Sequence, residues 1–161
     1  MPSADGSNTK NLAAGYLRCV LALRRDVDPD GIWSPGTDPD QAAYEVVEKA
    51  IRTGPAQRAW ELVLEVLRQT PDEDLATEAA GSLEDLVRHQ GNNLIDQLEA
   101  EAQSNERFRW ALGTIWLAED DLSASVLERV VCASGNKIKP LTGPKPSLRV
   151  IDRIRNRPPN E

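Results

Sequence analysis

The stretch WELVLEVLRQTPDE, residues 60–73, decides the fold. Apolar residues recur in its first half every three or four positions, which is the spacing of one helix face. The residues on this face are Trp60, Val63, Leu64 and Leu67, with Leu62 and Val66 on its flank. Only a narrow polar stripe is left for solvent, so the pattern predicts a helix at the centre of a helical core.

The end of the same stretch predicts a helix boundary. Thr70 is a residue type that caps helices, Pro71 suits a first helical turn, and Glu73 completes the Thr-x-x-Glu pattern of a capping box. We therefore expect the Thr70 side chain to cap a following helix. Glycine stops and serine caps predict further boundaries downstream, at Gly81, Ser82, Gly91 and Ser104.

Helical periodicity continues on both sides of this stretch. Apolar residues at helical spacing predict helices over residues 9–27, 39–53, 82–90, 92–103, 104–116 and 122–133. Residues 26–38 are rich in Asp, Pro and Gly and predict a loop. No segment shows the period of a strand. We predict an all-α domain, either an irregular bundle or a short HEAT-like stack of about seven helices.

Charge divides the 161 residues into an acidic body and a basic tail. Residues 1–135 hold 12 Lys/Arg and 24 Asp/Glu, a net charge of −12, whereas residues 136–161 hold 7 and 2, a net charge of +5. Five of the 11 prolines lie in the tail. We predict a helical domain over 1–135 and a basic, Pro-containing segment over 136–161 that docks on it through Leu148, Ile151 and Ile154.

The composition disfavours cofactor chemistry. The chain has one histidine and two cysteines, and it contains no GxSxG elbow, GxGxxG motif or phosphate loop. Cys19 and Cys132 are interpreted as buried apolar residues. Asp85 and His89 share a helix face, but a helix start by itself favours acidic residues there. We therefore expect no metal, no cofactor and no enzymatic activity.

Two tryptophans and a group of acids are the candidate interface residues. Trp33 falls in the predicted loop and Trp110 lies off the apolar face of its helix, and tryptophan is frequent at binding hot spots. The acidic candidates are Glu61, Glu65, Asp96 and Glu99. Arg107 and Arg109 flank Phe108 and could form a nucleic-acid platform with the aromatics. We favour ion pairs of these arginines with Glu99 or Glu101.

A set of residues between 60 and 116 resembles a known family. These residues are Trp60-Glu61, GSLEDLV at 81–87, Gly91, Ile95-Asp96, EAEA at 99–102, RFR at 107–109, Ala111-Leu112 and Trp116. The pattern resembles an uncharacterised bacterial family, classed only as a domain of unknown function. Ser82 stands where the relatives often have proline, and serine also suits a helix start. The resemblance implies a helical bacterial domain and no particular activity.

The charge pattern favours one function class. An acidic body repels nucleic acids and anionic membranes and attracts basic proteins. The expected function is therefore protein binding without catalysis, most concretely the neutralisation of a basic toxin by an immunity-type protein. A helical adaptor or regulatory subunit is the alternative, and the basic tail leaves nucleic-acid binding as a lesser one. No apolar run is long enough to cross a bilayer and no export signal is visible, so we predict a cytoplasmic protein.

Overall fold

A computed structural model describes residues 4–25 and 39–140. Its helices are α1 (Ala4–Arg25), α2 (Pro39–Thr53), α3 (Ala56–Gln69), α4 (Leu75–Glu78), α5 (Glu84–Ser104), α6 (Glu106–Leu112) and α7 (Ala124–Ala133). A 3-10 turn, η1 (Asp72–Asp74), precedes α4, and a π-helical segment, η2 (Ala79–Leu83), joins α4 to α5. The described residues contain no β-strand, so the all-α prediction is confirmed.

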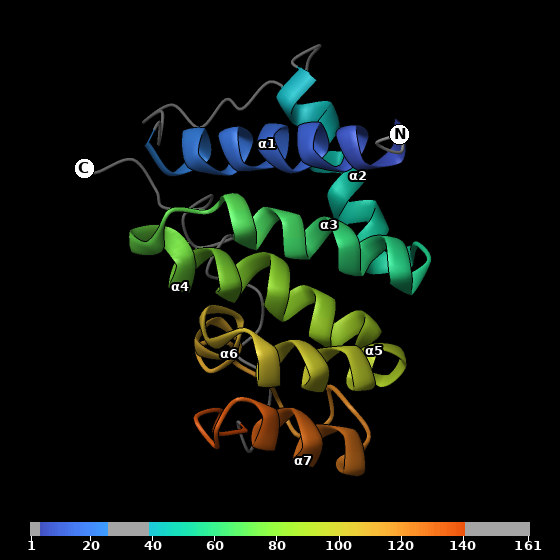
Figure 1. Ribbon diagram of the computed structural model, residues 1–161, viewed down its shortest axis with the longest axis vertical. Helices are drawn as coiled ribbons and strands as arrows, with labels where there is room; N and C mark the ends of the chain where they lie inside the picture. The colour runs from blue at the N-terminus through green and yellow to red at the C-terminus, as the bar shows by residue number, and fades with distance from the viewer. Residues whose placement is uncertain (1–3, 26–38, 141–161) are drawn as a thin grey trace, which may run out of the picture.

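The helices form successive layers along the long axis of the molecule. α1 and α2 lie at one end, α3, α5 and α6 follow, and α7 lies at the other end (Figure 1). α3 buries Trp60, Val63 and Leu67 of the predicted face and also Leu62, Val66 and Ala59, whereas Leu64 is only partly buried. Trp60 meets the ring of Phe108 edge-on, with 5.6 Å between centroids, and this contact joins α3 to α6.

The capping box predicted at residues 70–73 is wrong. Thr70 ends α3 instead of starting the next helix, and its hydroxyl donates to the Val66 carbonyl at 2.7 Å. The following turn, η1, begins after Pro71 and has no side-chain cap. A threonine can donate to the carbonyl four residues earlier as readily as it can accept from a helix start, and here the end of α3 takes the hydroxyl.

The boundaries predicted at Gly81, Ser82 and Gly91 are also wrong. The chain stays helical from Leu75 to Ser104, through the π-helical segment, and the Ser82 hydroxyl donates back to the Glu78 carbonyl at 3.4 Å. Gly91 lies inside α5, where an added Cβ would stand 2.9 Å from a methyl carbon of Leu122. This glycine permits close packing and does not end a helix.

Smaller corrections concern helix ends and one cysteine. α1 already begins at Ala4, before the predicted start at Thr9, and α6 is capped by Asn105 instead of Ser104. The Asn105 side-chain oxygen accepts from the Phe108 N–H at 3.1 Å. Cys19 is buried as predicted, but Cys132 is exposed. None of the helices in the described ranges is both long and apolar enough to cross a membrane.

Candidate interaction surfaces

The connection between α6 and α7, residues 113–123, presents a tryptophan to solvent. Ile115 and Leu117 are buried, and Trp116 between them points outward with 63% of its surface exposed. The sequence predicts that the α6 helix continues through Trp116, whereas α6 ends at Leu112. Alternation of inward and outward side chains is the pattern of an extended segment, and it gives Trp116 its outward direction.

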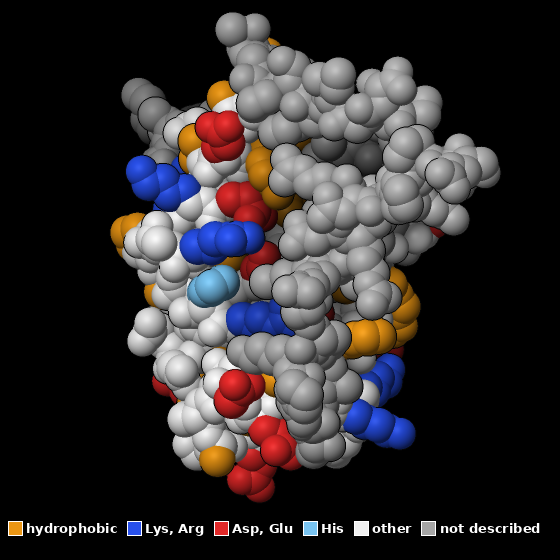
Figure 2. All heavy atoms as spheres, turned by 180° about the vertical axis from the view of Figure 1, so that it is seen from behind, with side chains coloured by type: hydrophobic (Ala, Val, Ile, Leu, Met, Phe, Trp, Pro, Cys, Tyr) orange, Lys and Arg blue, Asp and Glu red, His pale blue; other side chains and the backbone are white. Residues whose placement is uncertain are grey.

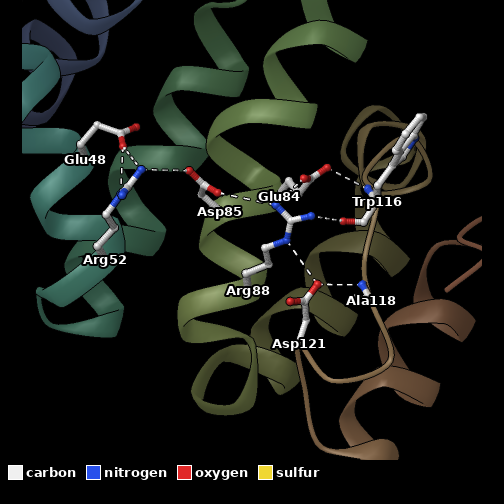
Figure 3. Close-up of polar contacts among 8 residues, drawn as sticks. All are labelled: Glu48, Arg52, Glu84, Asp85, Arg88, Trp116, Ala118 and Asp121. Carbon is white, nitrogen blue, oxygen red and sulfur yellow. Dashed lines mark hydrogen bonds and ion pairs between the residues drawn. The ribbon is translucent and has the colours of Figure 1, made fainter. Parts of the chain in front are cut away.

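Side chains of α5 and Asp121 hold the backbone around Trp116 (Figure 3). The Trp116 N–H donates to Glu84 Oε2 at 2.8 Å, and Arg88 Nη2 donates to the Trp116 carbonyl at 3.0 Å. Asp121 accepts from the Ala118 N–H at 2.7 Å and from Arg88 Nε at 3.2 Å. Arg88 also lies 2.6 Å from Glu84, so one guanidinium connects both carboxylates to the loop. We call Glu84, Arg88 and Asp121 the loop clamp.

The loop clamp is largely shielded from solvent. The Asp121 side chain is 3% exposed and that of Glu84 is 11% exposed. Burial raises the pKa of the Glu84 carboxyl, although the hydrogen bond from Trp116 and the charge of Arg88 act in the opposite direction. Hydrogen bonds to charged groups in such an environment are stronger than those at an open surface, so the loop backbone is firmly positioned.

The ionic contacts continue from the loop clamp to α2. Arg52 lies 3.8 Å from Asp85 and 3.1 Å from Glu48 (Figure 3). The pKa of the Glu48 carboxyl is raised, because the effect of burial exceeds the lowering effect of the Arg52 charge. Glu48, Arg52 and Asp85 thus extend the contacts of the loop clamp from α5 to α2.

Basic side chains border Trp116 on another side. A depression of about 350 Å³ beside it is lined by residues 113–116 together with Lys137 and Lys139. Ile138, between these lysines, is buried in the core. On the face seen in Figure 2, acidic and basic side chains lie side by side around the single histidine, His89, which is exposed.

A larger groove of about 850 Å³ lies between the start of α1, α3, η1 and the α5–α6 junction. Four residues singled out from the sequence line it, namely Glu61, Glu65, Glu101 and Arg107. Its apolar lining residues are Leu64, which is partly buried, and the buried Leu67, Leu75, Phe108 and Ala111. The sequence therefore identifies residues of a common groove, although it gives no indication that they meet.

Arg107 has partners other than those predicted. Its Nε donates to Asp72 at 2.9 Å, and its two terminal nitrogens donate to the carbonyls of Leu67 and Thr70. The predicted pairs with Glu99 or Glu101 are wrong for this residue. The last carbonyls of a helix have no partners within the helix, and a guanidinium fork from α6 satisfies those at the end of α3.

The other predicted ion-pair residues are also paired differently. Arg109 lies 3.9 Å from Glu106 of its own helix, and Glu101 accepts from the Asn105 amide at 2.8 Å. Asp96 and Glu99 both contact Arg129 of α7, at 2.7 and 2.5 Å. The Arg129 guanidinium holds the pKa of the Glu99 carboxyl below its usual range. These acids therefore join α5 to α7.

The remaining sequence candidates are Trp110, Trp33 and Asp85. Trp110 is 43% exposed on α6, and Trp33 lies outside the described residues. Asp85 contacts Arg52 and Arg88. Within residues 4–25 and 39–140, no three His, Cys, Asp or Glu side chains are grouped so that they could hold a metal ion.

Sequence reasoning missed Trp116 and its loop clamp. The order Ile-Trp-Leu at residues 115–117 is compatible with a helix as well as with an extended segment, and the long helical pattern before it favours the helix. Gly113 directly after Leu112 is the signal that could have ended the helix earlier.

Comparison with known proteins identified one family. The model of a Family of unknown function (DUF6869) matches residues 34–138, which include the loop clamp, Trp116 and most of the residues that line the groove. Neither the search of curated proteins nor the search of solved structures found a match.

Proposed function

Because the chain belongs to the Family of unknown function (DUF6869), its function has to be inferred from its own surfaces, and we propose that it is a non-enzymatic protein-binding domain. The observation that carries the proposal is Trp116, a largely exposed tryptophan on a backbone held by the loop clamp. The partner would bury the indole ring of Trp116 at the centre of the interface.

Energetics support this role for Trp116. Burying a large aromatic side chain stabilises a contact by about 2 kcal/mol or more, and tryptophan is enriched among residues that dominate binding energy. A flexible loop would lose conformational entropy on binding, which weakens affinity. The hydrogen bonds from Glu84, Arg88 and Asp121 already restrict the loop, so that little additional ordering is needed.

Charge supports a partner with a basic surface. The support is the net charge of −12 over residues 1–135, since the carboxylates of the loop clamp are buried and Lys137 and Lys139 border Trp116 itself. The concrete form of the proposal is an immunity-type protein that neutralises a basic toxin in the cytoplasm by covering its active site. The alternative is a helical adaptor or regulatory subunit of a larger bacterial system, which would bind mainly through apolar contacts.

The test of the proposal compares partner capture by matched tryptophan variants. Immobilised wild-type protein is expected to capture a partner from a lysate of the source cells, and Trp116→Ala should weaken that complex by about 30-fold. Trp110→Ala is the comparison variant, because it removes the same side chain from another exposed position, and an equal loss there would place Trp110, the candidate of the sequence analysis, in the interface as well. Thermal denaturation should show that both variants remain folded. A complex that tolerates Trp116→Ala would refute Trp116 as the recognition residue.

Salt dependence separates the two forms of the proposal. Raising the salt from about 0.05 M to about 0.5 M shortens the Debye length from roughly 14 Å to roughly 4 Å. Association with a basic toxin should slow strongly over this range, whereas dissociation should change less. An association rate that does not respond to salt would favour the adaptor.

A further inference from the structure

Among the described residues, the depression beside Trp116 is lined by two lysines and by no carboxylate. Its lining residues are 113–116 together with Lys137 and Lys139, and both lysines are exposed. Its volume of about 350 Å³ lies at the small end of the range of ligand pockets, so it suits single side chains of a partner. Ile115 is buried, so the accessible apolar surface is mainly the ring of Trp116.

The chain that follows α7 directs both lysines outward. It leaves α7 through Gly135 and Asn136, which lie in the left-handed region with φ of 73° and 59°. The Ser134 hydroxyl oxygen then accepts from the N–H groups of Lys137 and Ile138, at 3.2 and 3.4 Å. Ile138 is 3% exposed, and because its side chain points inward, the side chains of its two neighbours point to the surface.

Gly113 gives the Lys137 side chain its place beside Trp116. A Cβ added at Gly113 would stand 3.1 Å from Lys137 Cβ and 3.0 Å from Lys137 Cδ. The aliphatic part of this lysine therefore packs over a residue that has no side chain of its own. A larger residue at position 113 would displace it.

The two lysines keep their charge available. No ion pair in the described part of the chain involves the ammonium group of Lys137 or Lys139. The carboxylates of the loop clamp are 3% and 11% exposed, and the Trp116 ring points away from them (Figure 3). Glu119 and Asp120 follow in the same connection but do not line the depression. A side chain that enters the depression therefore meets the lysines and not the acids.

We propose that Trp116, Lys137 and Lys139 bind a segment of the partner in which an apolar side chain is flanked by Asp or Glu. The apolar side chain would lie against the Trp116 ring, and the acidic side chains would reach the two ammonium groups. A basic segment would be repelled. Residues 141–161 of this chain hold five Lys/Arg and two Asp/Glu, so charge complementarity disfavours them as the occupant.

The inference rests on the proposed function in taking Trp116 as the contact residue, and it adds the chemistry of that contact. The net charge of −12 over residues 1–135 attracts a basic partner at long range. The two lysines act at short range and select an acidic side chain at the point of contact. The partner would therefore be basic overall and present this acidic segment to Trp116.

Synthetic peptides test the site on the full chain at about 0.15 M salt, where charges farther away than roughly 8 Å are largely screened. The probe has one leucine between two pairs of glutamates, and the controls replace the glutamates by arginines or the leucine by serine. In a ¹⁵N-labelled sample, the indole N–H signal of Trp116 and the amide signals of residues 113–116 and 137–139 should move with the probe. The serine peptide should bind about tenfold more weakly. The arginine peptide should leave these signals in place.

Matched protein variants test the two lysines. Lys137→Gln combined with Lys139→Gln should weaken probe binding by about fivefold. The control, Lys10→Gln with Lys49→Gln, removes the same charge from exposed positions outside the depression and should leave probe binding unchanged. Lys137→Glu combined with Lys139→Glu should reverse the preference, so that the arginine peptide moves the Trp116 signals and the probe does not.

The outcomes separate this inference from the proposed function. Equal weakening by the two glutamine double variants, or an unreversed preference in the charge-reversed variant, would overturn the inference alone. Partner capture that still depends on Trp116 would then leave the proposed function standing. Capture that tolerates Trp116→Ala would refute both.

Discussion

Replacing Arg88 by methionine removes the centre of the loop clamp while keeping a long side chain on α5. The substitution deletes the contacts to Glu84, to Asp121 and to the Trp116 carbonyl, which measure 2.6, 3.2 and 3.0 Å. The two carboxylates keep their bonds to backbone N–H groups but lose the counter-charge of the guanidinium.

The magnitude follows from burial. Removing one partner of a buried ion pair costs about 3–5 kcal/mol, because the other charge is left without compensation. The Arg88 side chain is 29% exposed, so solvent reduces this effect, and we expect the free energy of unfolding to fall by about 2–4 kcal/mol. For a chain of this size a loss of about 3 kcal/mol lowers Tm by roughly 6–12 °C. A domain of ordinary stability would remain folded.

Denaturant unfolding and amide hydrogen exchange check this prediction. Exchange at the Trp116 and Ala118 amides should accelerate in Arg88→Met by more than exchange in α3, because the loop loosens before the core does. Adding Asp121→Asn should recover part of the stability, since it removes the negative charge that Arg88 balances in the wild type. A loss below about 1 kcal/mol, or unchanged exchange at both amides, would refute the assignment of Arg88 as the centre of the clamp.

Three further predictions concern stability. Thr70→Val should lower the free energy of unfolding by about 1 kcal/mol in denaturant melts, whereas Glu73→Ala should change it by less than about 0.5 kcal/mol, because no capping box forms. The pKa of Glu84 in the folded state lies above its ordinary value of 4.5. The free energy of unfolding should therefore fall as the pH rises just above 4.5. Glu84→Gln should reduce that fall in denaturant melts across this range. Gly91→Ala should destabilise the wild type by about 1 kcal/mol, because overpacking against Leu122 outweighs the gain in helix propensity. In a Leu122→Ala background the same substitution should stabilise the protein, and a double-mutant cycle measures the difference.

The helices could be predicted from sequence because their apolar faces repeat over several turns. The buried face of α3 needs only local spacing, and the break at Gly54-Pro55 is local as well. The end of α3 and the course of α5 depend on distant residues. Thr70 ends a helix whose last carbonyls are bound by Arg107, and Gly91 faces Leu122. Residues that act at long sequence separation leave no periodic pattern, so periodicity and capping rules assign their roles incorrectly.

For the candidate surfaces, too, the sequence indicates single residues but not which of them meet in the fold. The acids that line the groove could be selected from charge and helix position, but their grouping depends on how α1, α3 and the α5–α6 junction pack. The loop clamp joins residues 28 to 33 positions apart, and Glu84 and Asp121 look in the sequence like ordinary acids near a helix end and in a loop. In the folded chain both side chains are buried, and they accept hydrogen bonds from the loop backbone. Hydrogen bonds to those acceptors hold the backbone of Trp116, so Arg88→Met should weaken the proposed partner binding through Trp116 even though Arg88 need not touch the partner.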